Sequence, residues 1–231
     1  MRRLFTSFAL VWTVIVGAPA SAQNGPVVVE LFTSQGCSSC PPADALLHEL
    51  SQMPDVIALA LHVDYWDYIG WEDSFASPDY TRRQHAYARA AHARSVYTPQ
   101  MIINGTTHVV GSRTMQVMAA LQAHMAQPAL AAVEVAREGA SLQVRAESTS
   151  RGDYLVQIFR YLPEATVTIG RGENAGKTIT YTNIVQGWDV VGQWDGNGRF
   201  EADVSVAGDE PVVVVVQEAG MGAIIGAAQL N

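Results

Sequence analysis

Two cysteines three positions apart are the residues of this sequence best suited to chemistry. Cys37 and Cys40 enclose Ser38 and Ser39, and the sequence of 231 residues contains no other cysteine. A pair at this spacing can form a disulfide, act as a redox couple or bind a metal ion. We therefore expect the chemistry of the protein at these two sulfur atoms.

The residues around the pair predict a strand before it and a helix after it. Residues 27–32 form a short apolar run of the kind that is buried in a parallel sheet, and residues 43–50 repeat apolar side chains at helical spacing. Free backbone N–H groups at a helix N-terminus favour a thiolate. We therefore expect Cys37 to be the exposed, attacking sulfur and Cys40 to be the resolving sulfur.

The first part of the chain alternates strands and helices. Asn104-Gly105 lies between two β-rich runs, which is a strong hairpin signal. The order of strand, helix, strand, helix, hairpin and helix is that of the thioredoxin fold. It predicts an α/β thioredoxin-like domain over residues 23–128, with an inserted aromatic loop at 64–77. The expected elements are a strand at 27–32, a helix at 43–50, a strand at 56–63, a helix at 77–95, a hairpin at 101–110 and a helix from 112.

The second part of the chain, after Pro128, contains almost only strand signals. The apolar runs are short and evenly spaced, and Gly, Asn, Asp or Pro separates them, as in an antiparallel sandwich or barrel. We expect an all-β antiparallel sandwich-like domain over residues 129–231. The runs are Ala132–Arg137, Ser141–Glu147, Tyr154–Leu162, Lys177–Ile184, Trp188–Trp194, Arg199–Val206, Val212–Glu218 and Ala223–Leu230.

Four segments of the chain resemble a known family. The sequence is similar to the secreted, thioredoxin-like family of unknown function 1223 within the thioredoxin superfamily. The resemblance covers nearly the whole chain after the first residues, and it implies an exported bacterial protein without an established substrate. The segments that carry it are residues 30–44, 63–71, 97–100 and 172–178.

This resemblance implies roles for three further residues. Thioredoxin-like folds carry a cis-proline where Pro99 stands, and they place a substrate against its backbone, so Thr98 and Pro99 are expected to face a substrate. A trans proline in a turn is the alternative. Thioredoxins also place a buried acid before the first cysteine, where Glu30 stands one residue further away. Glu30 is therefore either a proton acceptor for the resolving thiol or a hydrogen-bonded structural acid.

The aromatic loop at 64–77 has two interpretations. It follows a strand expected to run parallel to the one before the cysteines, so both strand ends should lie at the same edge of the sheet. Trp66 and Trp71 would then bind a substrate. Alternatively, the loop packs its aromatic side chains against the second domain.

Two other patterns resemble ligand-binding sites but each lacks a required feature. His62, Asp64, His85 and His92 could join the cysteines around copper or zinc, but no close histidine spacing accompanies the two thiols, so we assign no metal site. The Gly-rich run 170–178 resembles a phosphate-binding loop, but it has Arg171 where that motif requires glycine. We interpret it as a turn between strands that could face the first domain, and no organic cofactor is implied.

The N-terminus indicates export. Arg2 and Arg3 precede the apolar run 8–16, and Ala20-Ser21-Ala22 follows, which is the pattern of a secretory signal peptide at residues 1–22. The formal net charge of −8 and the single lysine argue against nucleic acid or an anionic membrane as a partner. We expect a periplasmic or secreted protein.

These observations predict thiol–disulfide exchange by Cys37 and Cys40 on exported proteins or small thiols. Two alternatives remain open. The same cysteines could serve a periplasmic metal-binding protein or metallochaperone, or they could form a structural disulfide in a scaffold without catalytic activity.

Overall fold

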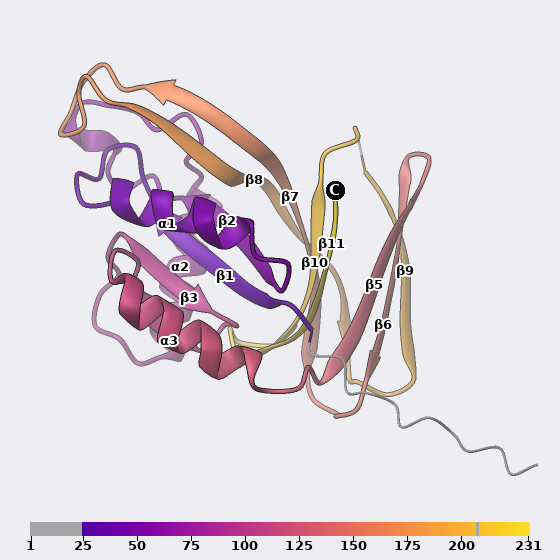
Figure 1. The fold of residues 1–231 in the computed structure, drawn as a ribbon. Coiled ribbons are helices and arrows are strands. Elements are labelled where there is room, and N and C mark those ends of the chain that lie inside the picture. The colour runs from indigo at the N-terminus through magenta and orange to yellow at the C-terminus, as the bar shows by residue number, and fades with distance from the viewer. Residues whose placement is uncertain (1–24, 207) are drawn as a thin grey trace, which may run out of the picture.

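A computed structural model describes residues 25–206 and 208–231 of the chain (Figure 1). The expected signal peptide lies outside the described residues. The elements are β1 (Val27–Thr33), α1 (Pro41–Ser51), β2 (Val56–His62), the 3-10 turn η1 (Asp67–Ile69), α2 (Pro78–Ala90), β3 (Gln100–Ile103), β4 (Thr107–Val110), α3 (Thr114–Met125), β5 (Ala131–Glu138), β6 (Ser141–Ser148), β7 (Tyr154–Thr168), β8 (Thr178–Trp194), β9 (Arg199–Ser205), β10 (Val212–Glu218) and β11 (Ile224–Leu230).

The elements expected in the first part of the chain are present. β1 and β2 pair in parallel over their whole length, with α1 as the crossover, and β3 and β4 follow as an antiparallel hairpin. Asn104 and Gly105 form the turn of this hairpin with positive φ angles of 45° and 75°. α2 begins as predicted, since the hydroxyl of Ser77 accepts a hydrogen bond from the Asp79 N–H, but it ends at Ala90 rather than near Ser95.

The predicted fold class is wrong. The chain does not form a thioredoxin-like α/β domain followed by an all-β sandwich-like domain, because strands from both halves share one mixed sheet. The order of its eight strands is β11-β10-β7-β8-β2-β1-β3-β4. β8 joins the edge of β2 through a parallel pair, Ala60 and Ile184. Within the described residues, only β5, β6 and β9 form a separate sheet.

Shared hydrophobic burial explains why the two halves do not separate. Phe32 and Leu59 of the first half belong to the same buried cluster as Phe159, Val213 and Val215 of the second half. These side chains are almost fully buried, so separating the halves would expose them to water. The pairing of β8 also covers backbone groups that an independent first domain would leave free at the edge of β2.

The β7–β8 hairpin is longer than the apolar runs predict. It pairs from Tyr154 and Trp194 to Thr168 and Thr178. Pro163 lies beyond the last residue of β7 that pairs with β10, so it stands at a sheet edge, where proline removes no ladder hydrogen bond. The hairpin therefore extends past the core and reaches across α1 toward the cysteine loop (Figure 1).

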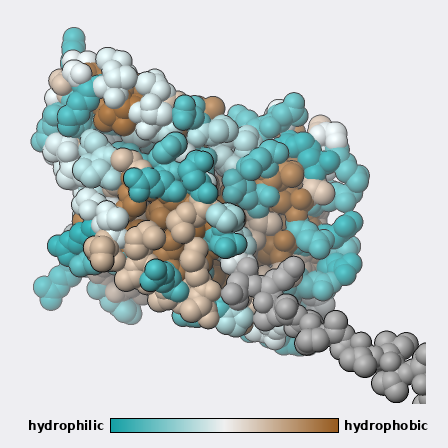
Figure 2. Space-filling model, viewed as in Figure 1, coloured by the Kyte–Doolittle hydropathy of each residue, from teal (hydrophilic) through white to brown (hydrophobic). Residues whose placement is uncertain are grey.

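The helices and the second sheet complete the layers. α1 and α3 cover one face of β1 through a cluster that includes Leu31, Leu47 and Leu121, while α2 covers the other face. The sheet of β5, β6 and β9 packs against β7, β10 and β11 through a third cluster. Apolar side chains gather over α3 on the viewed face, within a largely polar surface (Figure 2). In the described part of the chain, the helices are too short or too polar to cross a bilayer.

Candidate functional site

The Cys37–Cys40 disulfide lies in the loop between β1 and α1. The two sulfurs are bonded, and the Cα atoms are 5.4 Å apart. Cys40 is the N-cap residue of α1, and its carbonyl accepts a hydrogen bond from the Ala43 N–H at 2.8 Å. Pro41 and Pro42 occupy the first turn, where a missing N–H leaves no helical hydrogen bond unmade. The disulfide is thus present at the helix N-terminus that the sequence predicts.

Both cysteines are buried, so the expected exposure of Cys37 is wrong for this oxidised form. Cys37 is 1% exposed and Cys40 is 0% exposed, whereas Ser38 and Ser39 between them are exposed. The hydroxyl oxygen of Ser39 lies 3.4 Å from the Cys37 sulfur. A reagent therefore reaches the disulfide only if this loop moves.

Thr98 and Pro99 lie beside the cysteine loop. The Thr98–Pro99 peptide bond is cis, which is the isomer predicted from the resemblance to thioredoxin-like folds. The Ser39 hydroxyl donates to the Thr98 carbonyl at 3.5 Å. A Cβ placed on Gly111 would lie 3.3 Å from Cβ of Pro99 and 3.0 Å from Cβ of Ala43. Pro99 is therefore close to the first turn of α1, and its role toward a substrate stays a prediction.

Trp66 forms the part of the aromatic loop nearest to Thr98. Its indole N–H donates to the Thr98 hydroxyl at 2.7 Å. The ring also stacks on Tyr68, with centroids 6.4 Å apart, and Tyr68 is 81% exposed. This pair of rings is the arrangement expected for a substrate-binding surface, because it keeps aromatic area in contact with solvent.

The other end of the aromatic loop is packed against the second half of the chain. The Trp71 indole N–H donates to the Gln35 side-chain carbonyl at 2.7 Å, and the ring lies beside the β7–β8 turn, where a Cβ on Gly170 would be 3.3 Å from it. Phe75 packs edge-on against Tyr181 of β8, with ring centroids 6.0 Å apart. Trp71 and Phe75 therefore follow the packing interpretation, whereas Trp66 and Tyr68 remain candidates for binding.

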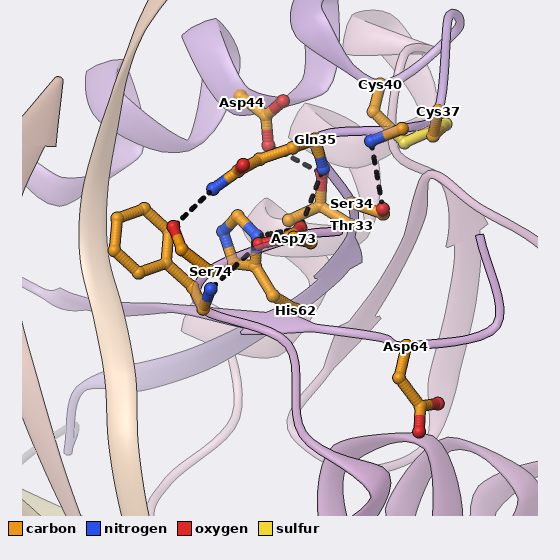
Figure 3. Close-up of polar contacts among 12 residues, drawn as sticks. Thr33, Ser34, Gln35, Cys37, Cys40, Asp44, His62, Asp64, Asp73 and Ser74 are labelled. Carbon is orange, nitrogen blue, oxygen red and sulfur yellow. Dashed lines mark hydrogen bonds and ion pairs between the residues drawn. A yellow bond between two sulfur atoms is a disulfide. The ribbon is translucent and has the colours of Figure 1, made fainter. Parts of the chain in front are cut away.

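Asp73 fixes the backbone just before the disulfide (Figure 3). One of its oxygens accepts hydrogen bonds from the Gln35 N–H at 2.7 Å and from a ring nitrogen of His62 at 2.8 Å. Burial opposes ionisation of Asp73, but His62 and the hydrogen bonds to Gln35 and Phe75 outweigh it and lower its pKa. The contact thus places a carboxylate against the loop that leads to Cys37.

Asp44 lies one turn along α1 from Cys40, on the same face of the helix. It is buried, and the Thr33 hydroxyl donates to one of its oxygens at 2.7 Å (Figure 3). Its other oxygen is buried without a hydrogen-bond partner in the described structure, as are Nε2 of His62 and the hydroxyl of Tyr181. Burial raises the pKa of Asp44 to about 7, against the opposing effect of His62.

Asp44 and Asp73 are functional-site candidates that the sequence alone does not predict. The i, i+4 spacing from Cys40 is a signal that could have singled out Asp44, because this spacing puts both residues on one helix face. Asp73 had no comparable signal. It reaches Gln35 only because the aromatic loop folds back onto the end of β1.

The structure does not bring Glu30 to the disulfide. Side chains alternate along β1, and Glu30 lies on the α2 face, whereas Leu31 faces α1. Its carboxylate binds the Arg83 guanidinium at 2.6 Å and accepts from the Tyr87 hydroxyl. Burial opposes the charge of Arg83, but Glu30 outweighs it and raises the pKa of Arg83. These contacts make Glu30 a structural acid.

The candidate metal ligands are dispersed. His62 is buried against Asp73, Asp64 accepts from the Thr81 hydroxyl, and His85 and His92 are exposed. Over residues 25–206 and 208–231, we find no group of three or more His, Cys, Asp or Glu side chains arranged to hold a metal ion.

The turn between β7 and β8 also reaches the site. The Asn174 side-chain amide donates to the backbone carbonyls of Gln35 and Cys37, both at 2.9 Å. The Gly-rich run 170–178 is therefore a turn between strands that faces the cysteine loop, as the sequence predicts. No sequence signal pointed to Asn174 itself, since 137 residues separate it from Cys37.

Comparisons with known proteins identify relatives of the chain. A family model described as "Protein of unknown function (DUF1223)" matches residues 28–217. An X-ray crystal structure of a protein from Agrobacterium tumefaciens, solved in a structural genomics programme, is 35% identical in sequence. The match covers 88% of this chain and 93% of that chain, with a TM-score of 0.77. A comparison with curated proteins gave no match.

The family match agrees with the resemblance that the four sequence segments indicated. It spans most of the chain, from the second residue of β1 to the penultimate residue of β10. The protein therefore belongs to DUF1223, a family of proteins of unknown function.

Proposed function

We propose that the protein carries out thiol–disulfide exchange at Cys37 and Cys40, acting on exported proteins or small thiols. The observation that carries the proposal is the position of the disulfide at the N-terminus of α1, beside Thr98 and Pro99. The positive end of a helix dipole stabilises a thiolate, and a stabilised thiolate is a good leaving group in exchange.

The proposed reaction begins with a substrate thiolate. It attacks the Cys37 sulfur, the Cys37–Cys40 bond breaks, and a mixed disulfide forms while Cys40 leaves as a thiolate and takes up a proton. A second substrate thiolate then attacks the substrate sulfur of the mixed disulfide and releases Cys37. The substrate gains a disulfide, and the protein keeps two thiols. The reverse sequence reduces a substrate disulfide.

Thr98, Pro99 and Trp66 would hold the substrate. The Thr98 carbonyl faces the cysteine loop through Ser39, so an extended peptide could pair with this backbone by strand addition. Trp66 and the exposed Tyr68 would contribute aromatic contact area next to it. Trp71 would act indirectly, because it binds the side chain of Gln35.

The proposed compartment is the periplasm or the exterior of the cell. The support is the pattern of basic, apolar and small residues at 1–22, which is typical of a secretory signal. Disulfides form and persist in such oxidising compartments.

Burial of both sulfurs favours a second candidate function, a structural disulfide. With Cys37 at 1% and Cys40 at 0% exposure, the bond would stabilise the turn between β1 and α1 without reacting with other molecules. A structural disulfide has a very negative reduction potential and resists attack by thiols, whereas an exchange catalyst does not.

Single-cysteine variants separate the two candidates. Reduced Cys40→Ser keeps only Cys37, and on incubation with oxidised glutathione it should form a stable mixed disulfide that mass spectrometry detects. Cys37→Ser is the matched control and should react far more slowly, because Cys40 is held as the N-cap residue of α1, with its carbonyl bonded to the N–H groups of Ala43 and Asp44. Equal, slow labelling of both variants would contradict exchange through Cys37. Tight stoichiometric copper or zinc on the reduced wild type would support the metal-binding alternative instead.

A further inference from the structure

The connection between β7 and β8, residues 169–177, is called the hairpin tip here. Its backbone is closed by hydrogen bonds from the Ile169 N–H to the Lys177 carbonyl at 2.9 Å and from the Gly176 N–H to the Ile169 carbonyl at 2.8 Å. Although the hairpin tip is a turn, Asn174 at its centre is only 1% exposed. An asparagine buried within an exposed turn indicates that the turn rests on another part of the molecule.

Asn174 uses both ends of its amide. The nitrogen donates to the carbonyls of Gln35 and Cys37, and the oxygen accepts from the Lys177 ammonium at 2.8 Å. An ammonium only donates and a carbonyl only accepts, so these partners fix the orientation of the amide. We call this set of contacts the Asn174 bridge.

The hairpin tip also packs against the aromatic loop. A Cβ on Gly170 would lie 3.3 Å from the Trp71 ring, and a Cβ on Gly172 would lie 3.4 Å from Cβ of Trp71. Gly172 also has a φ of 76°, a conformation that glycine adopts without strain. Trp71 in turn binds the Gln35 side chain. The cysteine loop is therefore held by the hairpin tip both directly and through Trp71.

The Asn174 bridge opposes the movement that exchange requires. Attack on the sulfur of Cys37 needs this residue to leave its buried position, and moving its backbone breaks the hydrogen bond between Asn174 and the Cys37 carbonyl. Displacement of the hairpin tip would also remove the Asn174 hydrogen bond from the Gln35 carbonyl. Breaking two hydrogen bonds between buried groups is unfavourable unless new partners replace them.

We propose that Asn174 is a positioning residue that restricts access to the Cys37–Cys40 disulfide, and that an exchange partner must displace the hairpin tip. This inference rests on the exchange proposed above and names the element that selects its partners. Small thiols react only in the fraction of time that the loop opens by itself, and therefore slowly, whereas a polypeptide that binds beside Thr98 can displace the hairpin tip and supply its own hydrogen bonds. Lys177 supports the bridge by orienting the amide.

The test is the rate at which dithiothreitol reduces the oxidised protein. One dithiothreitol thiolate attacks the Cys37 sulfur and releases Cys40, and its second thiolate then closes the cyclic disulfide and releases Cys37 as a thiol. Asn174→Asp keeps the size of the side chain but replaces the donating nitrogen with an oxygen that repels both carbonyls. We expect Asn174→Asp to be reduced roughly tenfold faster than wild type.

Asn183→Gly is the matched control. Asn183 lies on β8 and also donates from its side-chain nitrogen to a backbone carbonyl, that of Ala58, at 2.9 Å. Its φ of 49° suits glycine, so this variant loses one comparable hydrogen bond far from the cysteine loop without added strain. We expect its reduction rate to equal that of wild type. This control separates opening of the cysteine loop from general destabilisation of the hairpin.

Lys177→Met keeps the proposal testable if Asn174→Asp does not fold. It should accelerate reduction in the same direction but less, roughly threefold, and Lys177→Arg should restore the wild-type rate because Arg can donate to the same oxygen. Wild-type reduction rates in folded Asn174→Asp and Lys177→Met would overturn the inference. Failure of Cys40→Ser to trap a mixed disulfide would instead overturn the proposed exchange, so the two failures are distinguishable.

Discussion

At the scale of single residues, Asp44 combines a buried carboxyl group with a location next to the disulfide. Only one of its oxygens has a hydrogen-bond partner in the described structure, the Thr33 hydroxyl. A buried carboxylate without full hydrogen bonding is unfavourable, which is why the pKa of Asp44 rises to about 7. In the folded protein Asp44 is therefore protonated over a pH range in which the unfolded chain is ionised.

This difference predicts how stability depends on pH. Between about pH 4 and pH 7 the folded state holds a proton on Asp44 that the unfolded state has lost, so this group makes stability fall as pH rises through that range. Asp44→Asn removes the contribution, which is on the order of 4 kcal/mol. We expect urea unfolding at several pH values to show a flatter profile for the variant. If the stability of Asp44→Asn fell with pH as steeply as that of the wild type between pH 4 and pH 7, the raised pKa of Asp44 would be contradicted.

Glu30 is the carboxylate partner of the buried Arg83 guanidinium. Glu30→Gln leaves the buried Arg83 guanidinium without its carboxylate partner, and breaking a buried ion pair costs about 3–5 kcal/mol. We expect a large drop in the free energy of unfolding, measured by urea denaturation. The pH dependence of thiol exchange should not change, because Glu30 faces α2 rather than α1. A shifted pH profile in the folded variant would return Glu30 to the proton-transfer role.

These two acids show what the sequence could and could not predict at this scale. The thioredoxin resemblance singles out Glu30 in the sequence, but the face of β1 on which it lies depends on which helix packs on which side of the strand. Asp44 does not stand out in the sequence, because α1 contains several polar residues and an acid in the first turn of a helix is common. Its burial follows from the contact of α1 with β8, which is non-local.

At the scale of elements, the β3–β4 turn contacts the end of β10. Gly105 has a φ of 75°, and a Cβ there would collide with the backbone carbonyl oxygen of Gly222. Next to it, the Ile224 N–H donates to the Asn104 carbonyl at 3.0 Å. The hairpin turn of the first half is thus packed directly onto the β10–β11 connection.

Gly105→Ala tests this contact. Gly139→Ala is the matched control, because Gly139 also has a positive φ, 60°, but open space around its Cβ position. The control should lose about 1 kcal/mol of stability from the left-handed backbone alone. Gly105→Ala should lose about 2 kcal/mol more stability than the control, because the backbone must also separate from Gly222. Equal thermal destabilisation of the two variants would argue against close packing at this position.

Local signals predicted most strands and helices of both halves, and in the second half they placed β5, β6, β9, β10 and β11 to within one residue. The Asn104-Gly105 turn and the Ser77 cap act within a few residues, so they could be found in the sequence. The length of β7 could not, because Pro163 has the pattern of a strand break. Pro163 fits within β7 because the pairing of β7 with β10 does not extend beyond Arg160.

At the scale of the whole molecule, one sheet connects the two halves of the chain. The connection depends on the pairing of β8 with β2, and on a buried cluster that mixes residues such as Leu59 and Phe159. Pairing between residues this far apart in sequence leaves no local pattern, which is why the sequence indicated two separate folds. The cysteine site depends on this arrangement, because the β7–β8 hairpin, whose strand β8 pairs with β2, also carries Asn174.

A shared core predicts cooperative unfolding. The protein should unfold in a single transition in differential scanning calorimetry, with a calorimetric enthalpy equal to the van't Hoff enthalpy, because neither half buries its apolar surface alone. Two resolved transitions would indicate halves that fold independently. Repeating the scan on the Cys37→Ser variant shows whether the disulfide contributes to the same transition.

The reduction potential of the Cys37–Cys40 pair tests the central claim most directly. It is measured by equilibrating the purified protein with glutathione buffers of known composition and quantifying the oxidised fraction. An exchange catalyst at the N-terminus of α1 predicts a potential between about −270 and −120 mV. A potential below about −300 mV, with no exchange on prolonged incubation, would contradict the account and identify the disulfide as structural.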